Sequence, residues 1–156
     1  MFRPALFPAI AWALLGCAGP TGFPEASYAI IEGRQADLVC EARDVAANTW
    51  TPAEADIRRM EASLFPLLSR ELLRDPEHNG EAEPEHYYRL YSGIVVDGTR
   101  MICVQGTHRS VYESQYAVRR EWRDPVVIRD GGSVQFRVRY DPATDRFEDF
   151  AFNHVA

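Results

Sequence analysis

The chain contains no lysine, since all 17 of its basic residues are arginines. Mechanisms that form a Schiff base on lysine, or that use a lysine amine as the base, are therefore excluded. The 23 acidic residues outnumber the arginines and give a formal net charge of −6 at pH 7. Because contacts to phosphates need a basic surface, this balance disfavours nucleic acid as a partner.

The sequence also lacks the common catalytic motifs. It contains no G-x-S-x-G, the nucleophile motif of many serine hydrolases, and no C-x-x-C redox motif. Gly131-Gly132 lies between two predicted strands, whereas a phosphate-binding loop leads from a strand to a helix. Glu148 and Asp149 are neighbours on a predicted strand, so we expect them on opposite faces rather than as an acid–base pair. The sequence thus favours a protein that is not an enzyme, with no catalytic residue and no cofactor predicted.

Histidines are few, and none has the spacing of a metal ligand. His78 and His86 lie in the acidic segment 75–86, which matches neither a zinc nor a calcium motif and is interpreted as a solvated loop. His108 lies at the end of a predicted strand and is the best isolated candidate for acid–base chemistry. The alternative is that His108 is an ordinary exposed histidine. No metal site is predicted.

No apolar run is long enough to span a membrane, but one near the start is typical of a signal peptide. Residues 5–15 follow Arg3 and have about the 7–15 apolar residues of a signal sequence, against roughly 20 for a spanning helix. The run ends in Leu14-Leu15-Gly16-Cys17, which resembles the lipobox of bacterial lipoprotein precursors. The resemblance implies cleavage before Cys17, a diacylglycerol on its sulfur and acylation of its amine. Ordinary secretory cleavage after Ala18, which would discard Cys17, is the alternative.

The lipobox resemblance implies an organisation and a location. Residues 1–16 would be a lipoprotein signal peptide, residues 17–27 a flexible tether and residues 28–156 a single domain. The membrane would be a partner through the lipid anchor, and an envelope protein or a cell-wall component would be a second one. Ala18, rather than an Asp, follows the cysteine, so we expect an outer-membrane lipoprotein that faces the periplasm.

The chain has only three cysteines, Cys17, Cys40 and Cys103. With Cys17 lipidated, Cys40 and Cys103 are left in an oxidising compartment, which predicts a structural disulfide between them. Two buried thiols or a redox pair are the alternatives. The chain-entropy estimate gives a disulfide closing such a long loop about 4 kcal/mol of stabilisation.

A long helix is predicted over residues 52–74. Thr51 can cap it, Pro52 suits its first position, and Glu54 is the acid of a capping box. Pro66 lies inside the predicted helix and should kink or divide it. Apolar residues that recur at steps of three and four predict its buried face: Ile57, Met60, Leu64, Leu67 or Leu68, and Leu72.

A β-hairpin is predicted over residues 87–106, with Asp97-Gly98 as a type I′ turn. Counting back from the turn pairs Ile94 with Met101 and Ser92 with Cys103, and the face that carries them should pack on the helix. We expect the opposite face either to bind a ligand or partner, or to be covered by another segment of the chain. That opposite face carries Tyr87, Arg89, Tyr91, Ile102 and Val104.

The chain closes with two more predicted strands. Val134, Phe136, Val138 and Tyr140 alternate with Gln135, Arg137 and Arg139, which predicts a strand with one apolar face and one cationic face. A turn over residues 141–145 leads to a last strand with Phe147, Phe150 and Phe152. This tail, from Gly131-Gly132 to Phe152-Asn153, is similar to the C-terminal hairpin of small uncharacterised secreted proteins of proteobacteria.

The predicted fold class is α+β: one long N-terminal helix packed on a curved antiparallel sheet of about four to five strands. This order of a helix and then a meander resembles a cystatin-like or NTF2-like arrangement. Two functions stay open. The first is a non-enzymatic binding or accessory lipoprotein, and the second is a small-molecule-binding or weakly hydrolytic domain with a pocket in the curved sheet. The residues predicted for a ligand or partner surface are Tyr87, Arg89, Tyr91, His108, Arg137 and Arg139.

Overall fold

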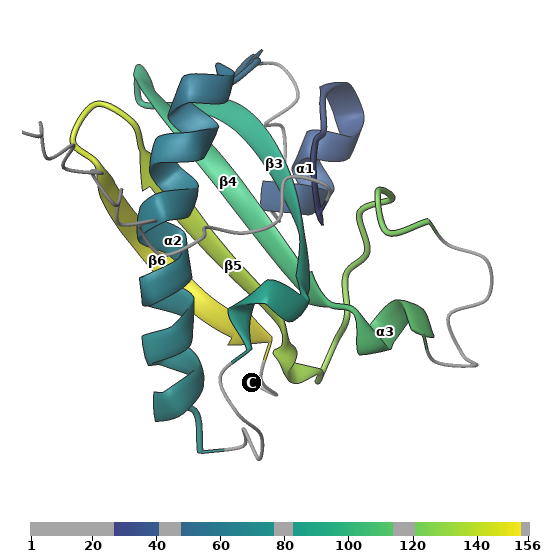
Figure 1. Cartoon of the computed structure of the whole chain (residues 1–156). Coiled ribbons are helices and arrows are strands. Elements are labelled where there is room, and N and C mark those ends of the chain that lie inside the picture. The colour runs from purple at the N-terminus through teal and green to yellow at the C-terminus, as the bar shows by residue number, and fades with distance from the viewer. Residues whose placement is uncertain (1–26, 41–47, 77–82, 114–120, 154–156) are drawn as a thin grey trace, which may run out of the picture.

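Six strands and one long helix make up most of the described structure, a computed structural model that describes residues 27–40, 48–76, 83–113 and 121–153. The predicted signal peptide, Cys17 and all of the tether except Ser27 lie outside these residues, as do residues 77–82 of the acidic segment. The class is α+β, as predicted, and Figure 1 shows the long helix lying across one face of the sheet.

The sheet has the strand order β1-β3-β4-β5-β6, and β2 also pairs with β3. The strands are β1 (Tyr28–Ile30), β2 (Thr49–Trp50), β3 (Tyr87–Val96), β4 (Thr99–His108), β5 (Gly132–Asp141) and β6 (Arg146–Asn153). The helices are α1 (Ala36–Cys40), α2 (Glu54–Arg74) and α3 (Ser110–Glu113), with 3₁₀ turns η2 (Gly33–Gln35) and η4 (Pro84–His86).

The outer edge of β3 is covered by two short strands, of which the sequence indicated only the first, as a short apolar run that is either a strand or an ordered lead-in. β1 pairs in parallel with β3, with Tyr28 opposite Arg89, and β2 pairs antiparallel to it, with Trp50 opposite Gly93. The predictions of a purely antiparallel sheet, of four to five strands and of an N-terminal helix are therefore wrong. Strands of three and two residues are too short to show an alternating pattern in the sequence.

Helix α2 has the predicted buried face. Ile57, Met60, Leu64, Leu68 and Leu72 are at most 1% exposed, so the spacing of three and four identified them correctly. The helix continues through Pro66, which is exposed, as is Ala62 four residues before it. The carbonyl that loses its helical hydrogen bond to proline therefore belongs to a residue on the solvent side.

The predicted cap is not the one observed. The helix begins at Glu54 with Ala53 as its N-cap, and no side chain caps it. The Thr51 hydroxyl instead donates to Glu32 Oε1 at 2.5 Å and so connects the start of α2 to the chain after β1.

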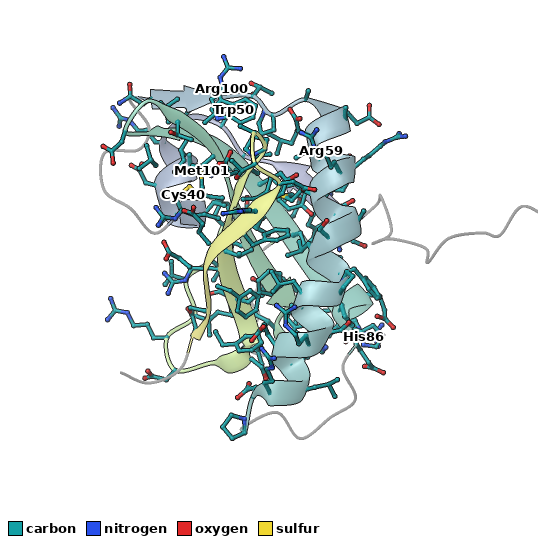
Figure 2. All side chains as sticks on the ribbon, turned by 90° about the vertical axis from the view of Figure 1, so that its left-hand side faces the viewer. Cys40, Trp50, Arg59, His86, Arg100 and Met101 are labelled. Atoms are coloured by element: carbon teal, nitrogen blue, oxygen red, sulfur yellow. A yellow bond between two sulfur atoms is a disulfide. The ribbon has the colours of Figure 1, made fainter. Side chains whose placement is uncertain are left out.

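The register of the hairpin is as predicted, but its two faces are exchanged. Ile94 lies opposite Met101 and Ser92 opposite Cys103. However, α2 packs on the other face, which carries Tyr87, Tyr91, Ile102 and Val104. Figure 2 places Arg59 of α2 and Cys40 of α1 on opposite sides of the sheet.

Both faces of the sheet are covered, and this explains the wrong choice of face. On the α1 side, Val39 packs with Leu90, Ile94, Met101 and Cys103 in a second core cluster. When both faces carry apolar residues, alternation gives the register but cannot decide which face meets which helix. The face that α2 covers is decided by a polar interaction between Arg89 of β3 and Glu61 of α2.

Arg89 lies on the α2 face of β3 and is completely buried. Its Nε and a terminal nitrogen donate to Glu61 Oε1 of α2 at 3.1 and 3.0 Å, and a further nitrogen donates to the Tyr87 carbonyl at 2.8 Å. Tyr91 also donates to Glu61 Oε1, at 2.7 Å. Burial is the main cause that raises the pKa of Tyr91 well above its usual value, so this hydroxyl stays a donor.

We expect Glu61→Gln to lower the free energy of unfolding by about 3–5 kcal/mol, because it takes the carboxylate away from a guanidinium that is buried under α2. The double variant Glu61→Gln, Arg89→Met removes both charges and should lose less than the single variant. Urea unfolding followed by circular dichroism measures both.

Glu54→Gln is the matched control, because the Glu54–Arg58 side chains are 60% and 69% exposed. It should change the free energy of unfolding by no more than about 0.5 kcal/mol. A loss at Glu61→Gln as small as in this control would contradict a decisive role of the buried pair.

Candidate functional site

A cavity of about 710 Å³ lies on the α1 face of the sheet. The Cys40 and Cys103 residues form part of its wall. Its apolar side chains include Val39, Ile94, Val96 and Ala151, and its polar ones include Asn48, Arg137, Arg139 and Asp149. This volume is within the roughly 300–1,000 Å³ typical of small-molecule sites.

Strand β5 positions the two arginines. Arg137 lies opposite Gln105 of β4, and Arg139 lies opposite Cys103. Because side chains alternate, residues two apart share a face, and their Cα atoms are about 6.6–6.8 Å apart along the strand. On the other side Arg137 pairs with Ala151 of β6, a residue with a small side chain.

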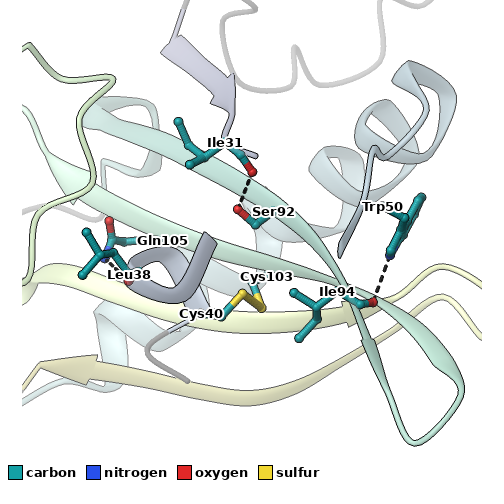
Figure 3. Close-up of a disulfide and its surroundings, with 8 residues drawn as sticks. All are labelled: Ile31, Leu38, Cys40, Trp50, Ser92, Ile94, Cys103 and Gln105. Atoms are coloured by element: carbon teal, nitrogen blue, oxygen red, sulfur yellow. Dashed lines mark hydrogen bonds between the residues drawn. A yellow bond between two sulfur atoms is a disulfide. The ribbon is translucent and has the colours of Figure 1, made fainter. Parts of the chain in front are cut away.

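The disulfide fastens α1 over this face. Cys40 and Cys103 are bonded, with their Cα atoms 5.4 Å apart, so the predicted disulfide is confirmed. Figure 3 shows the neighbouring contacts: Ser92 donates to the Ile31 carbonyl at 2.7 Å, and Gln105 Nε2 donates to the Leu38 carbonyl at 3.3 Å. The α1 segment that carries Val39 and Cys40 is therefore joined to β4 by one covalent and one polar contact.

A β-bulge in β6 brings Asp149 to the cavity. The pairing with β5 is irregular between Arg137 and Arg139, and Asp149 has a positive φ of 54°. Phe147, Phe150 and Phe152 all pack against the α2 core, which the extra residue of a bulge allows. Asp149 lies on the other face of the sheet, the α1 face, where it forms an ion pair with Arg139. The step of three between Phe147 and Phe150 was the sequence signal of this bulge.

The structure separates the residues predicted for the ligand or partner surface. Arg137 and Arg139 line the cavity. Tyr87, Arg89 and Tyr91 are at most 3% exposed beneath α2, so the prediction that they form an open surface is wrong, and the alternative that another segment covers them holds. His108 lies at the end of β4 and is not among the residues that line the cavity. Sequence reasoning missed Val39, Asn48, Asp149 and Ala151 as wall residues.

His108 belongs to a separate polar group at the ends of β3 and β4. Its Nδ1 is 2.8 Å from Ser110 Oγ, and its ring centroid is 5.9 Å from that of His86. His86 Nδ1 is in turn 2.5 Å from Glu83 Oε2. Partial burial, and then the nearby His86 and Arg109, lower the pKa of His108 below its usual value.

Two further findings concern the described residues. Within ranges 27–40, 48–76, 83–113 and 121–153, no group of three or more His, Cys, Asp or Glu side chains is placed to hold a metal ion. Among the helices in those same ranges, none has both the length and the apolar character needed to cross a membrane.

We expect the stability of the protein to fall as the pH drops from about 7.5 to about 5, in part because of His108. A lowered pKa means that the folded chain binds this proton less readily than the unfolded chain, whose histidine titrates near 6.5. The stability that comes with a neutral His108 is therefore fully present above that pH and is lost progressively as the pH falls below it. His108→Asn should show a smaller decrease between the two pH values in urea unfolding, and an equal decrease would contradict this role.

Comparison with known proteins identifies no relative of this chain: no family model, no curated protein and no solved structure matches it.

Proposed function

We propose that this chain is a non-enzymatic binding or accessory protein of the bacterial cell envelope, anchored through a lipidated Cys17. The observation that carries the proposal is the Cys40–Cys103 disulfide. Such bonds form and persist in oxidising compartments and are rare in the cytosol. An oxidising location is also what the lipobox resemblance of residues 14–17 implies.

The anchor and the domain would work together at the membrane surface. Several acyl chains on Cys17 would give stable attachment, since a single chain binds only marginally. Residues 17–27 would then link the anchor to the domain, and we place the protein at the outer membrane facing the periplasm. Its partner there would be an envelope protein or a cell-wall component. The order of helix and meander is our reason for proposing a cystatin-like or NTF2-like arrangement within the α+β class.

The cavity favours a second candidate function, the binding of a small molecule. It has the size of a small-molecule site, and two arginines lie on its wall. Hydrolysis has weaker support, because His108 does not line the cavity. The two functions are compatible, since an anchored envelope protein can also hold a soluble ligand.

Mass spectrometry of the chain expressed in a bacterium with an outer membrane tests the anchor. We expect a mature N-terminus at Cys17 that carries a diacylglycerol and an amide-linked acyl chain. Cys17→Ser should remove the lipid and move the protein from the membrane fraction to the soluble fraction.

The double variant Cys40→Ser, Cys103→Ser is the matched control. It removes the two other cysteines, and it should remain lipidated and in the membrane fraction. Wild-type protein that is found reduced, unmodified at Cys17 and in the cytosol would contradict the proposal.

A further inference from the structure

We propose that the cavity beside the disulfide binds a small organic carboxylate, whose anionic head contacts Arg137 and Arg139 and whose apolar body packs on the α1 side. This inference deepens the second candidate function above and rests on the cavity being a binding site. It does not depend on where in the cell the protein is located.

The head of the ligand is indicated by the two arginines. They lie on one face of β5, two residues apart, and both line the cavity. A guanidinium presents a planar set of donors that matches a carboxylate, and charge-assisted hydrogen bonds of this kind are about twice as strong as neutral ones. A carboxylate between the two strand positions can therefore accept from either side chain or from both.

The two arginines of the cavity wall are less exposed to water than its two acidic residues. Arg139 is 38% exposed, whereas the Asp149 side chain is 65% exposed. Arg137 is likewise half-buried, and Asp97, the other acid on the wall, is exposed at the hairpin turn. Charges that are less exposed to water interact more strongly with a ligand, so the wall favours an anion over a cation.

The body of the ligand is indicated by the apolar residues of the same cavity. Val39 of α1, Ile94 and Val96 of β3 and the disulfide present apolar surface to the same cavity. An inorganic anion would leave this surface and most of the 710 Å³ to water. An organic acid with a short hydrocarbon body uses both the arginines and the apolar wall.

Asp149 now occupies the place at Arg139 that the ligand head would take. The bulge holds its carboxylate next to the guanidinium, where the two form an ion pair. An ion pair between side chains this exposed contributes only about 0–1 kcal/mol. Exchange of the Asp149 carboxylate for that of a ligand therefore costs little, and Asp149 acts as an internal competitor.

Isothermal titration calorimetry of the purified full-length chain with hexanoate tests the ligand class. We expect saturable binding of one hexanoate per chain. Acetate lacks the apolar body and hexanamide lacks the charge, so each should bind at least about tenfold more weakly. Equal binding of hexanoate and hexanamide, or no saturable binding of hexanoate, would overturn the proposal.

Variants with opposite expected effects separate this site from a general loss of structure. Arg137→Gln and Arg139→Gln should each weaken hexanoate binding several-fold, whereas Asp149→Asn should strengthen it several-fold by removing the competing carboxylate. Arg70→Gln, on the exposed side of α2, is the matched arginine control and should bind hexanoate like wild type.

The thermal midpoint of each variant shows whether it is folded. If a Gln variant does not fold, the sign of the Asp149→Asn effect still decides, since weaker or unchanged binding in a folded Asp149→Asn protein contradicts the proposal. Hexanoate binding by a chain that is not lipidated would contradict the envelope proposal and support the carboxylate site. A lipidated chain that does not bind hexanoate would support the envelope proposal and contradict the carboxylate site.

Discussion

The buried contact between Glu61 and Arg89 decides how the layers of this protein are arranged. Both faces of β3 carry apolar residues, and either could receive the leucines of α2. A guanidinium with no exposed surface must find a carboxylate and carbonyl oxygens within the fold, and α2 brings Glu61 to it. Once that face belongs to α2, the other face is left to the shorter α1. The cavity can then form only where α1 leaves the sheet incompletely covered.

The α1 side therefore differs from the α2 side in what holds it together. The α2 side is closed by a continuous apolar stripe of the helix and by aromatic residues of β3, β5 and β6. On the α1 side, a helix of five residues cannot bury so much surface, and the disulfide to Cys103 compensates by fixing its end to β4. The same bond shapes the wall next to Arg139, so a stabilising element and the candidate binding site share their residues.

The parts of the fold that local patterns determine could be predicted from the sequence. The stripe of α2 follows from spacing along one helix, and the pairing of Ser92 with Cys103 follows from counting back from the Asp97-Gly98 turn. The disulfide followed from the two cysteines that remain when the lipobox resemblance assigns Cys17 to a lipid anchor. What could not be predicted depends on contacts between distant segments: the face that α2 covers, the addition of β1 and β2 to β3, and the meeting of Val39 with Arg139 around one cavity. The bulge at Asp149 could be predicted in part. The spacing of three between Phe147 and Phe150 indicates it, whereas a search for strict alternation does not detect it.

The bulge has a consequence for solubility. β6 is the last strand in the sheet order, so within the described residues no strand covers its outer side. An open strand edge invites backbone pairing with other copies, which leads to aggregation. In β6 the extra residue at Asp149 interrupts the regular ladder, and the exposed charged residues Arg146 and Glu148 precede it. The irregularity that aims a carboxylate at Arg139 thus also makes this edge a poor template for amyloid-like stacking.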